Sequence, residues 1–163
     1  MTTAPDLVVA ALQAALAGEH AAVYGYSVIG GRIEGASAVA RLAVEGYSEH
    51  RTVRDALVEA LVGRGESPVP TEPGYELPAP VDAAAAAREL ARLLEDRCGV
   101  LHAGLVATAE GGERRLAAQA LLGSAVRAVR WGAPPTAFPG VSAASRPHPT
   151  ASSRWTPSSP RPA

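Results

Sequence analysis

Residues 64–81, RGESPVPTEPGYELPAPV, decide the fold, because they hold five of the fourteen prolines in the chain. Proline inside a helix costs about 3 kcal/mol, so this stretch is predicted to be a long connection. No proline occurs before this cluster over residues 6–67 or after it over residues 81–133, and both ranges are rich in alanine, leucine, arginine and glutamate. These residue types favour helices. The sequence therefore predicts two helical halves joined by one long crossover.

Glycine divides each half once, at Gly30-Gly31 with Gly35 and at Gly111-Gly112. Glycine is the usual residue just after a helix, and Asp82 suits an N-cap. The expected helices are 6–30, 36–63, 82–110 and 113–131. Aromatic residues make up only 4%, and no strand pattern is present. Two antiparallel hairpins linked by one long proline-rich crossover make an all-α, up-and-down four-helix bundle with ferritin-like topology.

The bundle is expected to span residues 1–140. The remaining residues, 141–163, are rich in proline, serine and arginine and show no periodicity. Such a composition buries too little apolar surface to offset the entropy of ordering. We therefore expect a disordered and passive C-terminal tail.

Composition excludes several classes of protein. Fifteen basic residues, all arginine, against sixteen acidic ones give a formal charge of −1, which argues against a nucleic-acid partner. A single cysteine, Cys98, excludes an intramolecular disulfide and a cysteine-based zinc site. No uninterrupted apolar run reaches eighteen residues and the N-terminus lacks a basic start, so we expect no membrane span and a cytoplasmic location. Because alanine leaves a modest core per residue, we expect a homo-oligomer, a dimer.

Each expected helix carries a stripe of residues at helical spacing, which predicts the face that it buries. On the fourth helix this stripe is Ala118, Leu122, Ala125 and Val129. Polar residues interrupt the stripes of the other three helices near their midpoints, at Glu19, His50 and Glu95. Helices of equal length place their midpoints in one layer, so we expect these three side chains to meet inside the bundle. Glu49 and His102 lie close enough in the sequence to assist them.

Carboxylates and imidazoles that converge inside a bundle can form a metal site. Glu19, His50 and Glu95 are therefore the predicted ligands, with iron or manganese as the metal. The same residues can also satisfy one another as a Glu–His or Glu–Arg network without metal, because buried charges need partners. A di-metal site requires Glu-x-x-His on two helices, and the sequence contains none. The sequence is compatible with a di-metal site, a mononuclear site or a metal-free network. Because ligands of a di-metal site are missing, we expect that the chain binds no cofactor.

Other candidates point to packing. Cys98 lies on the apolar stripe of the third helix and is expected in the core. Tyr24, Tyr26 and Tyr47 lie near the polar layer, and a redox role for a tyrosine would depend on metal. Trp131 is expected to pack at the end of the bundle with Phe138. No catalytic or cofactor-binding residue is predicted.

The chain resembles an actinobacterial family of ferritin-like domains of unknown function over roughly residues 7–140. The resemblance rests on several short motifs: EHAAVYGY at 19–26, HRTVRDAL at 50–57, YELPAPV at 75–81, ARELA at 87–91 followed by Glu95, AVRW at 128–131 and AFPG at 137–140. It implies a ferritin-like bundle and supplies no activity.

Three functions are compatible with these residues. The first is a ferritin-like binding or structural module without a complete di-metal site, which the polar residues on three helices but not on the fourth favour. The second is a metal-dependent oxidoreductase or metal-storage protein that uses Glu19, His50 and Glu95. The third is a small-ligand pocket at the same layer, where Glu19 and His50 orient a polar group.

Overall fold

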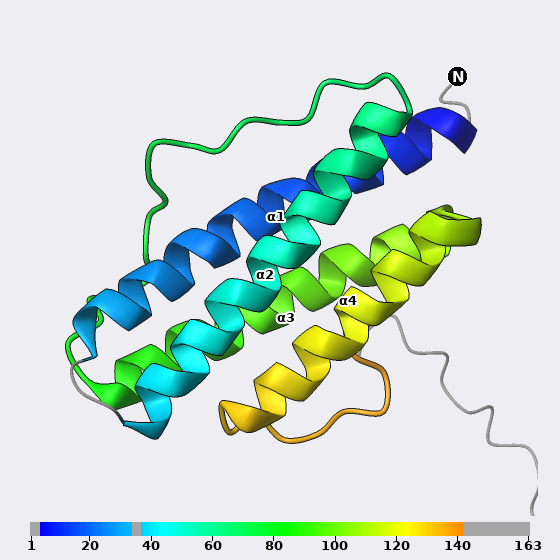
Figure 1. Cartoon of the computed structure of the whole chain (residues 1–163). Coiled ribbons are helices and arrows are strands. Elements are labelled where there is room, and N and C mark those ends of the chain that lie inside the picture. The colour runs from blue at the N-terminus through cyan, green and yellow to red at the C-terminus, as the bar shows by residue number, and fades with distance from the viewer. Residues whose placement is uncertain (1–3, 34–36, 142–163) are drawn as a thin grey trace, which may run out of the picture.

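The computed structural model describes residues 4–33 and 37–141 and forms four helices, with no strand among those residues (Figure 1). The helices are α1 (Ala4–Arg32), α2 (Ala38–Gly63), α3 (Ala84–Thr108) and α4 (Gly111–Arg130). The prediction of an all-α four-helix bundle is confirmed. Apart from Val141, the expected tail lies outside the described residues.

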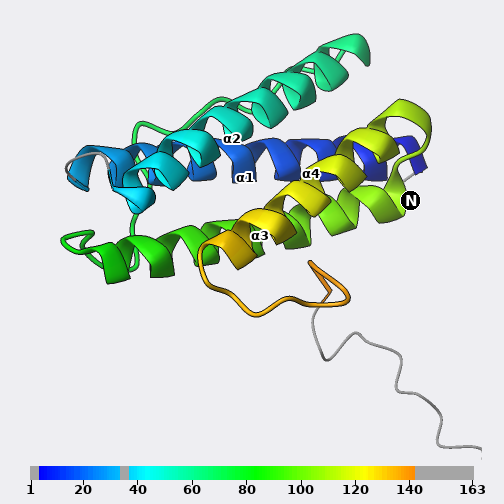
Figure 2. The same cartoon turned by 60° about the horizontal axis from the view of Figure 1, so that its bottom comes forward.

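Helix α1 packs against both α2 and α3, and α3 also packs against α4. Each hairpin is antiparallel, and α1 and α3 also run in opposite directions (Figure 1). The crossover returns the chain to the end of the bundle where α2 began, so α2 and α3 are parallel. Figure 2 shows α4 beside α3, with α1 and α2 forming the other layer.

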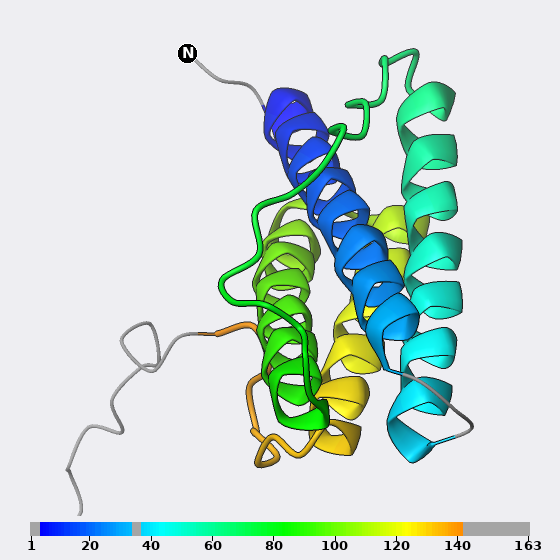
Figure 3. The same ribbon diagram turned by 90° about the vertical axis from the view of Figure 1, so that its left-hand side faces the viewer.

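The crossover is fixed along the outer side of α1 (Figure 3). Gln13 donates a hydrogen bond from Nε2 to the carbonyl of Ser67 and accepts one at Oε1 from the backbone N–H of Val69, both at 2.8 Å. His20 donates from Nε2 to the carbonyl of Val69 at 3.2 Å. Since the crossover has no helix or sheet of its own, these bonds satisfy part of its backbone.

Most helix ends lie one or two residues from their predicted positions, and two of these differences have a local cause. Helix α1 continues through Gly30 and Gly31 to Arg32, because Ile29 is fully buried and the half-buried Ile33 packs against the same cluster. That packing outweighs a propensity cost of about 1 kcal/mol per glycine. Helix α3 begins at Ala84 after an Ala83 N-cap without a side-chain hydrogen bond, so Asp82 is not the cap.

The predicted buried face of α4 is wrong. Ala118 is exposed, and Leu122 and Val129 are 64% and 44% exposed. The face that packs against the bundle lies about one residue further round the helix. It consists of Ala117, Ala120, Ser124, Arg127 and Ala128.

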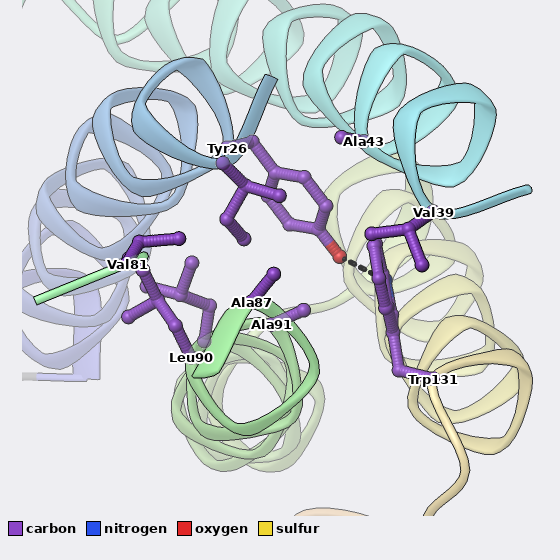
Figure 4. Close-up of a cluster of buried hydrophobic side chains, with 10 residues drawn as sticks. Tyr26, Val39, Ala43, Val81, Ala87, Leu90, Ala91 and Trp131 are labelled. Atoms are coloured by element: carbon purple, nitrogen blue, oxygen red, sulfur yellow. Dashed lines mark hydrogen bonds between the residues drawn. The ribbon is translucent and has the colours of Figure 1, made fainter. Parts of the chain in front are cut away.

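Two hydrophobic clusters flank the middle of the bundle. One gathers Tyr26, Val39, Leu90 and Trp131 with smaller residues at the end where α1 and α4 finish (Figure 4). The other gathers side chains near the opposite end, which are Val8, Leu12, Ala15, Leu16, Leu57, Leu61, Leu105, Ala109 and Ala117. On every helix, the buried polar residues fall between the two clusters in the sequence.

Helix α1, over Pro5–Arg32, is the one described helix that is long and apolar enough to cross a membrane. Length and composition alone give this result, and the core helix of a soluble protein passes the same test. In the bundle, α1 buries Leu12, Leu16 and Glu19 completely against its neighbours.

Candidate functional site

A polar layer crosses the middle of the bundle and takes residues from all four helices. It contains Glu19 of α1, His50 of α2, Glu95 and His102 of α3, and Ser124 and Arg127 of α4. Each of these residues is at most 6% exposed. The structure therefore brings together the three predicted site residues, Glu19, His50 and Glu95, and adds three more.

His50 lies between the two carboxylates. Its Nδ1 is 2.7 Å from Oε2 of Glu19, and its Nε2 is 3.1 Å from Oε1 of Glu95. Burial alone would lower the pKa of His50, but the hydrogen bonds and negative charges of Glu19 and Glu95 outweigh burial and raise it to about 9. Since each ring nitrogen faces a carboxylate oxygen, both nitrogens donate and His50 is a cation at neutral pH.

Glu19 accepts a hydrogen bond from a histidine at each oxygen. His50 occupies Oε2, and Nε2 of His102 lies 2.7 Å from Oε1. Burial would raise the pKa of Glu19, yet the hydrogen bonds from His102 and His50 and the positive charge of His50 lower it to about 2. Glu19 is therefore a carboxylate that joins α1 to both α2 and α3.

Glu95 uses its two oxygens unequally. Its Oε1 accepts hydrogen bonds from the Tyr26 hydroxyl at 2.5 Å, His50 Nε2 at 3.1 Å and Arg127 Nε at 2.9 Å. Its Oε2 is buried and has no hydrogen-bond partner among the described residues. Burial would raise the pKa of Glu95, but His50 and Arg127 hold it below its usual value, so this side chain is also a carboxylate.

Arg127 is the charged residue that α4 contributes to the layer, although the sequence analysis predicted none on this helix. Besides Glu95, it contacts Oε2 of Glu49 through Nη1 at 2.6 Å and Oγ of Ser124 through Nη2 at 3.2 Å. Glu49 is half-exposed, so the guanidinium extends from the core to the surface. Arg127 lies in the last turn of α4, where the helix dipole favours a cation.

Tyr26 and Trp131 extend the layer into the neighbouring cluster. The Trp131 indole N–H donates to the Tyr26 hydroxyl at 2.8 Å (Figure 4). That hydroxyl in turn donates to Glu95. Burial and the charge of Glu95 raise the pKa of Tyr26, so it keeps its proton. Trp131 is therefore buried in the core and begins a chain of hydrogen bonds that leads through Tyr26 to Glu95. The expected packing of Trp131 with Phe138 is wrong, since Phe138 is outside the cluster and 60% exposed.

Tyr26 reaches Glu95 because α2 carries glycine at position 46. A Cβ at Gly46 would lie 2.3 Å from Cε1 of the Tyr26 ring, much closer than atoms approach. We expect Gly46→Ala to displace Tyr26 from Glu95 and to lower the free energy of unfolding by about 1–3 kcal/mol, as other overpacked cores do. Urea unfolding followed by circular dichroism measures this change.

Gly104→Ala is the matched control for Gly46→Ala, because Gly104 is an exposed α3 residue whose added Cβ meets no atom within 4 Å. We expect this control to gain about 0.5–1 kcal/mol from helix propensity. If both variants gained stability, Tyr26 would not be held against α2 as described.

Among the described residues, one group of side chains at the level of this layer has donors close enough for a metal ion. Glu19, His50 and Cys98 each offer a donor atom, and these atoms lie within 4.8 Å of one another. Burial and the nearby carboxylates raise the pKa of the Cys98 thiol well above its usual value, so it remains protonated. Both ring nitrogens of His50 are already hydrogen-bonded to carboxylates. A metal ion would have to displace these bonds, so the residues do not fit a metal centre as arranged.

Sequence reasoning missed Ser124 and Arg127 as members of the site. The predicted stripe of the fourth helix placed Leu122 and Val129 inside the bundle, and so left Ser124 and Arg127 outside it. The spacing of Ser124 and Arg127, one helical turn apart, was the available signal. Glu49, expected to assist at the metal, instead pairs with Arg127 at the edge of the layer.

Residues 11–143 match the family described as domain of unknown function DUF4439. The chain belongs to this family. The DUF4439 bundle is also similar to the crystal structure of a conserved hypothetical protein, rv2844, from Mycobacterium tuberculosis. The two are 34% identical with a TM-score of 0.74, and the match covers 83% of this chain and 98% of that one. No curated protein matches the chain.

Proposed function

We propose that this DUF4439 chain is a ferritin-like helical bundle that acts as a binding or structural module without a di-metal centre. The observation that carries the proposal is the position of the two cations in the polar layer. His50 lies between the two carboxylates, and Arg127 contacts Glu95 from α4. In a carboxylate-bridged metal site, metal ions would balance such buried carboxylates, whereas here cationic side chains balance them.

The charges of the layer support this proposal. Glu19 and Glu95 contribute two negative charges, and His50 and Arg127 contribute two positive charges. A metal ion would add positive charge to a layer that is already balanced. Arg127 would repel it from Glu95 at close range.

The alternative is a metal-dependent oxidoreductase or metal-storage protein that uses iron or manganese. The donors of Glu19, His50 and Cys98 within 4.8 Å of one another favour it. This alternative requires His50 to lose its proton and to rotate away from one carboxylate. It also requires a metal ion to displace the hydrogen bonds of His50 to Glu19 at 2.7 Å and to Glu95 at 3.1 Å, which are made by buried groups.

Metal content separates the two functions. The full chain is expressed in medium supplemented with iron, manganese and zinc, purified without a chelator or histidine tag, and analysed for metal per chain. We expect background metal in the wild type and in Glu19→Gln. Glu19→Gln leaves a buried histidine without its carboxylate, so we expect it to lose about 1–3 kcal/mol of unfolding free energy.

Glu59→Gln on the exposed side of α2 is the control for the lost charge, and we expect it to be neutral. One or more equivalents of metal in the wild type, falling to background in Glu19→Gln with the fold retained, would establish the metal-dependent function instead. Dimer formation, expected from the alanine-rich core, stays a prediction that light scattering tests.

A further inference from the structure

A cavity of about 360 Å³ lies between α3, α4 and the segment that follows α4. Figure 2 shows this segment folding back beneath α3 and α4. Its lining is mostly apolar, and the residues that the argument uses are Glu95, Gly99, Ser124, Ala125, Val126 and Val129. The volume falls in the range of small-molecule sites.

The wall formed by the segment is fixed in place. Gly140 has a φ of +72°, and a Cβ there would lie 2.2 Å from the carbonyl oxygen of Gly99. Only glycine allows this approach, so the end of the segment packs directly on the α3 backbone. Pro134, Pro135 and Pro139 also line the cavity and restrict the segment. The cavity is therefore built by the fold.

Among the charged residues that line the cavity, Glu95 is buried, whereas Asp96 and Arg130 are exposed. The Glu95 side chain is 1% exposed and lines the cavity, and its Oε2 has no hydrogen-bond partner among the described residues. Oε1 takes all three donors, so the lone pairs of Oε2 are left without a donor among the described residues. An unsatisfied buried acceptor next to an apolar cavity is the arrangement of a polar anchor in a ligand site.

The charges around Glu95 indicate which ligand group can donate a hydrogen bond to its Oε2. Arg127 and His50 already balance the two carboxylates of the layer, so Oε2 requires a hydrogen-bond donor and not a further positive charge. An anion would meet the carboxylates of Glu95 and Asp96, whereas Arg130, the cation that also lines the cavity, is already paired with Glu45. A neutral hydroxyl or amide N–H fits both conditions.

The rim of the cavity indicates an apolar body for the ligand. Val126 and Val129 line the cavity and remain 51% and 44% exposed. One water molecule occupies about 30 Å³, so water at Oε2 would leave most of this apolar volume to weakly held solvent. An apolar ligand would displace that solvent and cover the two valines.

We propose that this cavity binds a neutral, mainly apolar small molecule whose single hydroxyl or amide N–H donates to Oε2 of Glu95. The inference rests on the proposed function, because a metal ion and the ligand would compete for the same Glu95 carboxylate.

Matched probes test the proposal on the full chain. Benzyl alcohol supplies an apolar ring and one donor, benzyl methyl ether lacks the donor, and benzoate is an anion. Binding is followed by ¹H–¹⁵N NMR titration. We expect benzyl alcohol to bind with a Kd on the order of 1 mM and to shift the amides of Ala125, Val129 and Gly140. We expect the ether to bind about tenfold more weakly or worse, and benzoate not to bind.

A cavity-filling variant locates the site without touching the ion pairs. Ala125→Leu adds side-chain volume at the cavity wall, and we expect it to weaken benzyl alcohol binding about tenfold or more. Ala118→Leu, exposed on the same helix, is the control, and we expect its affinity to match the wild type. Absence of benzyl alcohol binding, equal binding of the ether, or unchanged binding in Ala125→Leu would each overturn the proposal.

The two proposals fail separately. If the wild type purifies with stoichiometric metal, the metal-free function is wrong. If the wild type is metal-free but does not bind benzyl alcohol, only the ligand site is wrong and the structural role of the layer stands.

Discussion

Replacing Arg127 with methionine is expected to lower the free energy of unfolding by about 3–5 kcal/mol, the largest effect that we predict for a single residue. Methionine fills much of the same volume but leaves Glu95 without its guanidinium partner at 2.9 Å. Glu95 is 1% exposed, so bulk solvent compensates little for the lost partner. Urea unfolding monitored by circular dichroism at neutral pH measures the loss.

Arg130→Met is the matched control for Arg127→Met. Arg130 lies one turn away on α4 and pairs with Glu45, but both side chains are more than 40% exposed. Exposed pairs contribute at most about 1 kcal/mol, so we expect a much smaller loss. Equal losses in the two variants would show that Arg127 acts as a surface residue. The double variant Glu95→Gln with Arg127→Met removes both charges, and we expect it to be more stable than Arg127→Met alone.

The second large effect is a fall in stability on the alkaline side of neutrality. The pKa of His50 is about 9 in the folded chain against 6.5 ordinarily, so its contribution is fully present below pH 6.5 and is lost as the pH rises through 9. A shift of this size corresponds to about 3 kcal/mol. The raised pKa values of Cys98 and Tyr26 in the folded chain also lower its stability at higher pH. The measurement of unfolding free energy against pH therefore ends at pH 9.

The acid side follows from Glu19, whose pKa is lowered from 4.5 to about 2. Its contribution is present above pH 4.5 and is lost as the pH falls through 2. The unfolding free energy, measured from pH 2 to 9, is therefore expected to be highest between about pH 4.5 and 6.5. We expect His50→Gln to lose the alkaline fall, whereas His20→Gln, on the outer side of α1, keeps it. An alkaline fall that persists in His50→Gln would assign it to another group.

Much of the fold could be predicted because proline and glycine act locally. The prolines of residues 64–81 excluded helix there, and glycines marked the two short connections, so four helices and one crossover followed. The ends were less predictable, since packing of Ile29 and Ile33 carried α1 past Gly30. That packing is tertiary, and no local pattern reports it.

The layer could be predicted in part for a related reason. Glu19, His50 and Glu95 are polar residues on otherwise apolar stripes, so their burial was visible in the sequence. Helix α4 has alanines on several faces, so periodicity does not select one, and the choice of Leu122 over Arg127 was wrong. Its buried face is decided by partners on other helices, Glu95 and Glu49, which the sequence of α4 does not contain.

The crossover also bears on how the chain folds. The first hairpin carries Glu19 and His50, and the second carries Glu95 and Arg127, so each hairpin brings one anion and one cation that pair within it. Either hairpin can form from contacts near in sequence before the two dock. Two of the bonds that then join the hairpins in the buried layer, from His50 to Glu95 and from His102 to Glu19, form between groups whose buried charges are already matched by these two ion pairs. Docking can thus proceed without burying an uncompensated charge at any step, which removes a barrier that a bundle with all its anions in one hairpin would face.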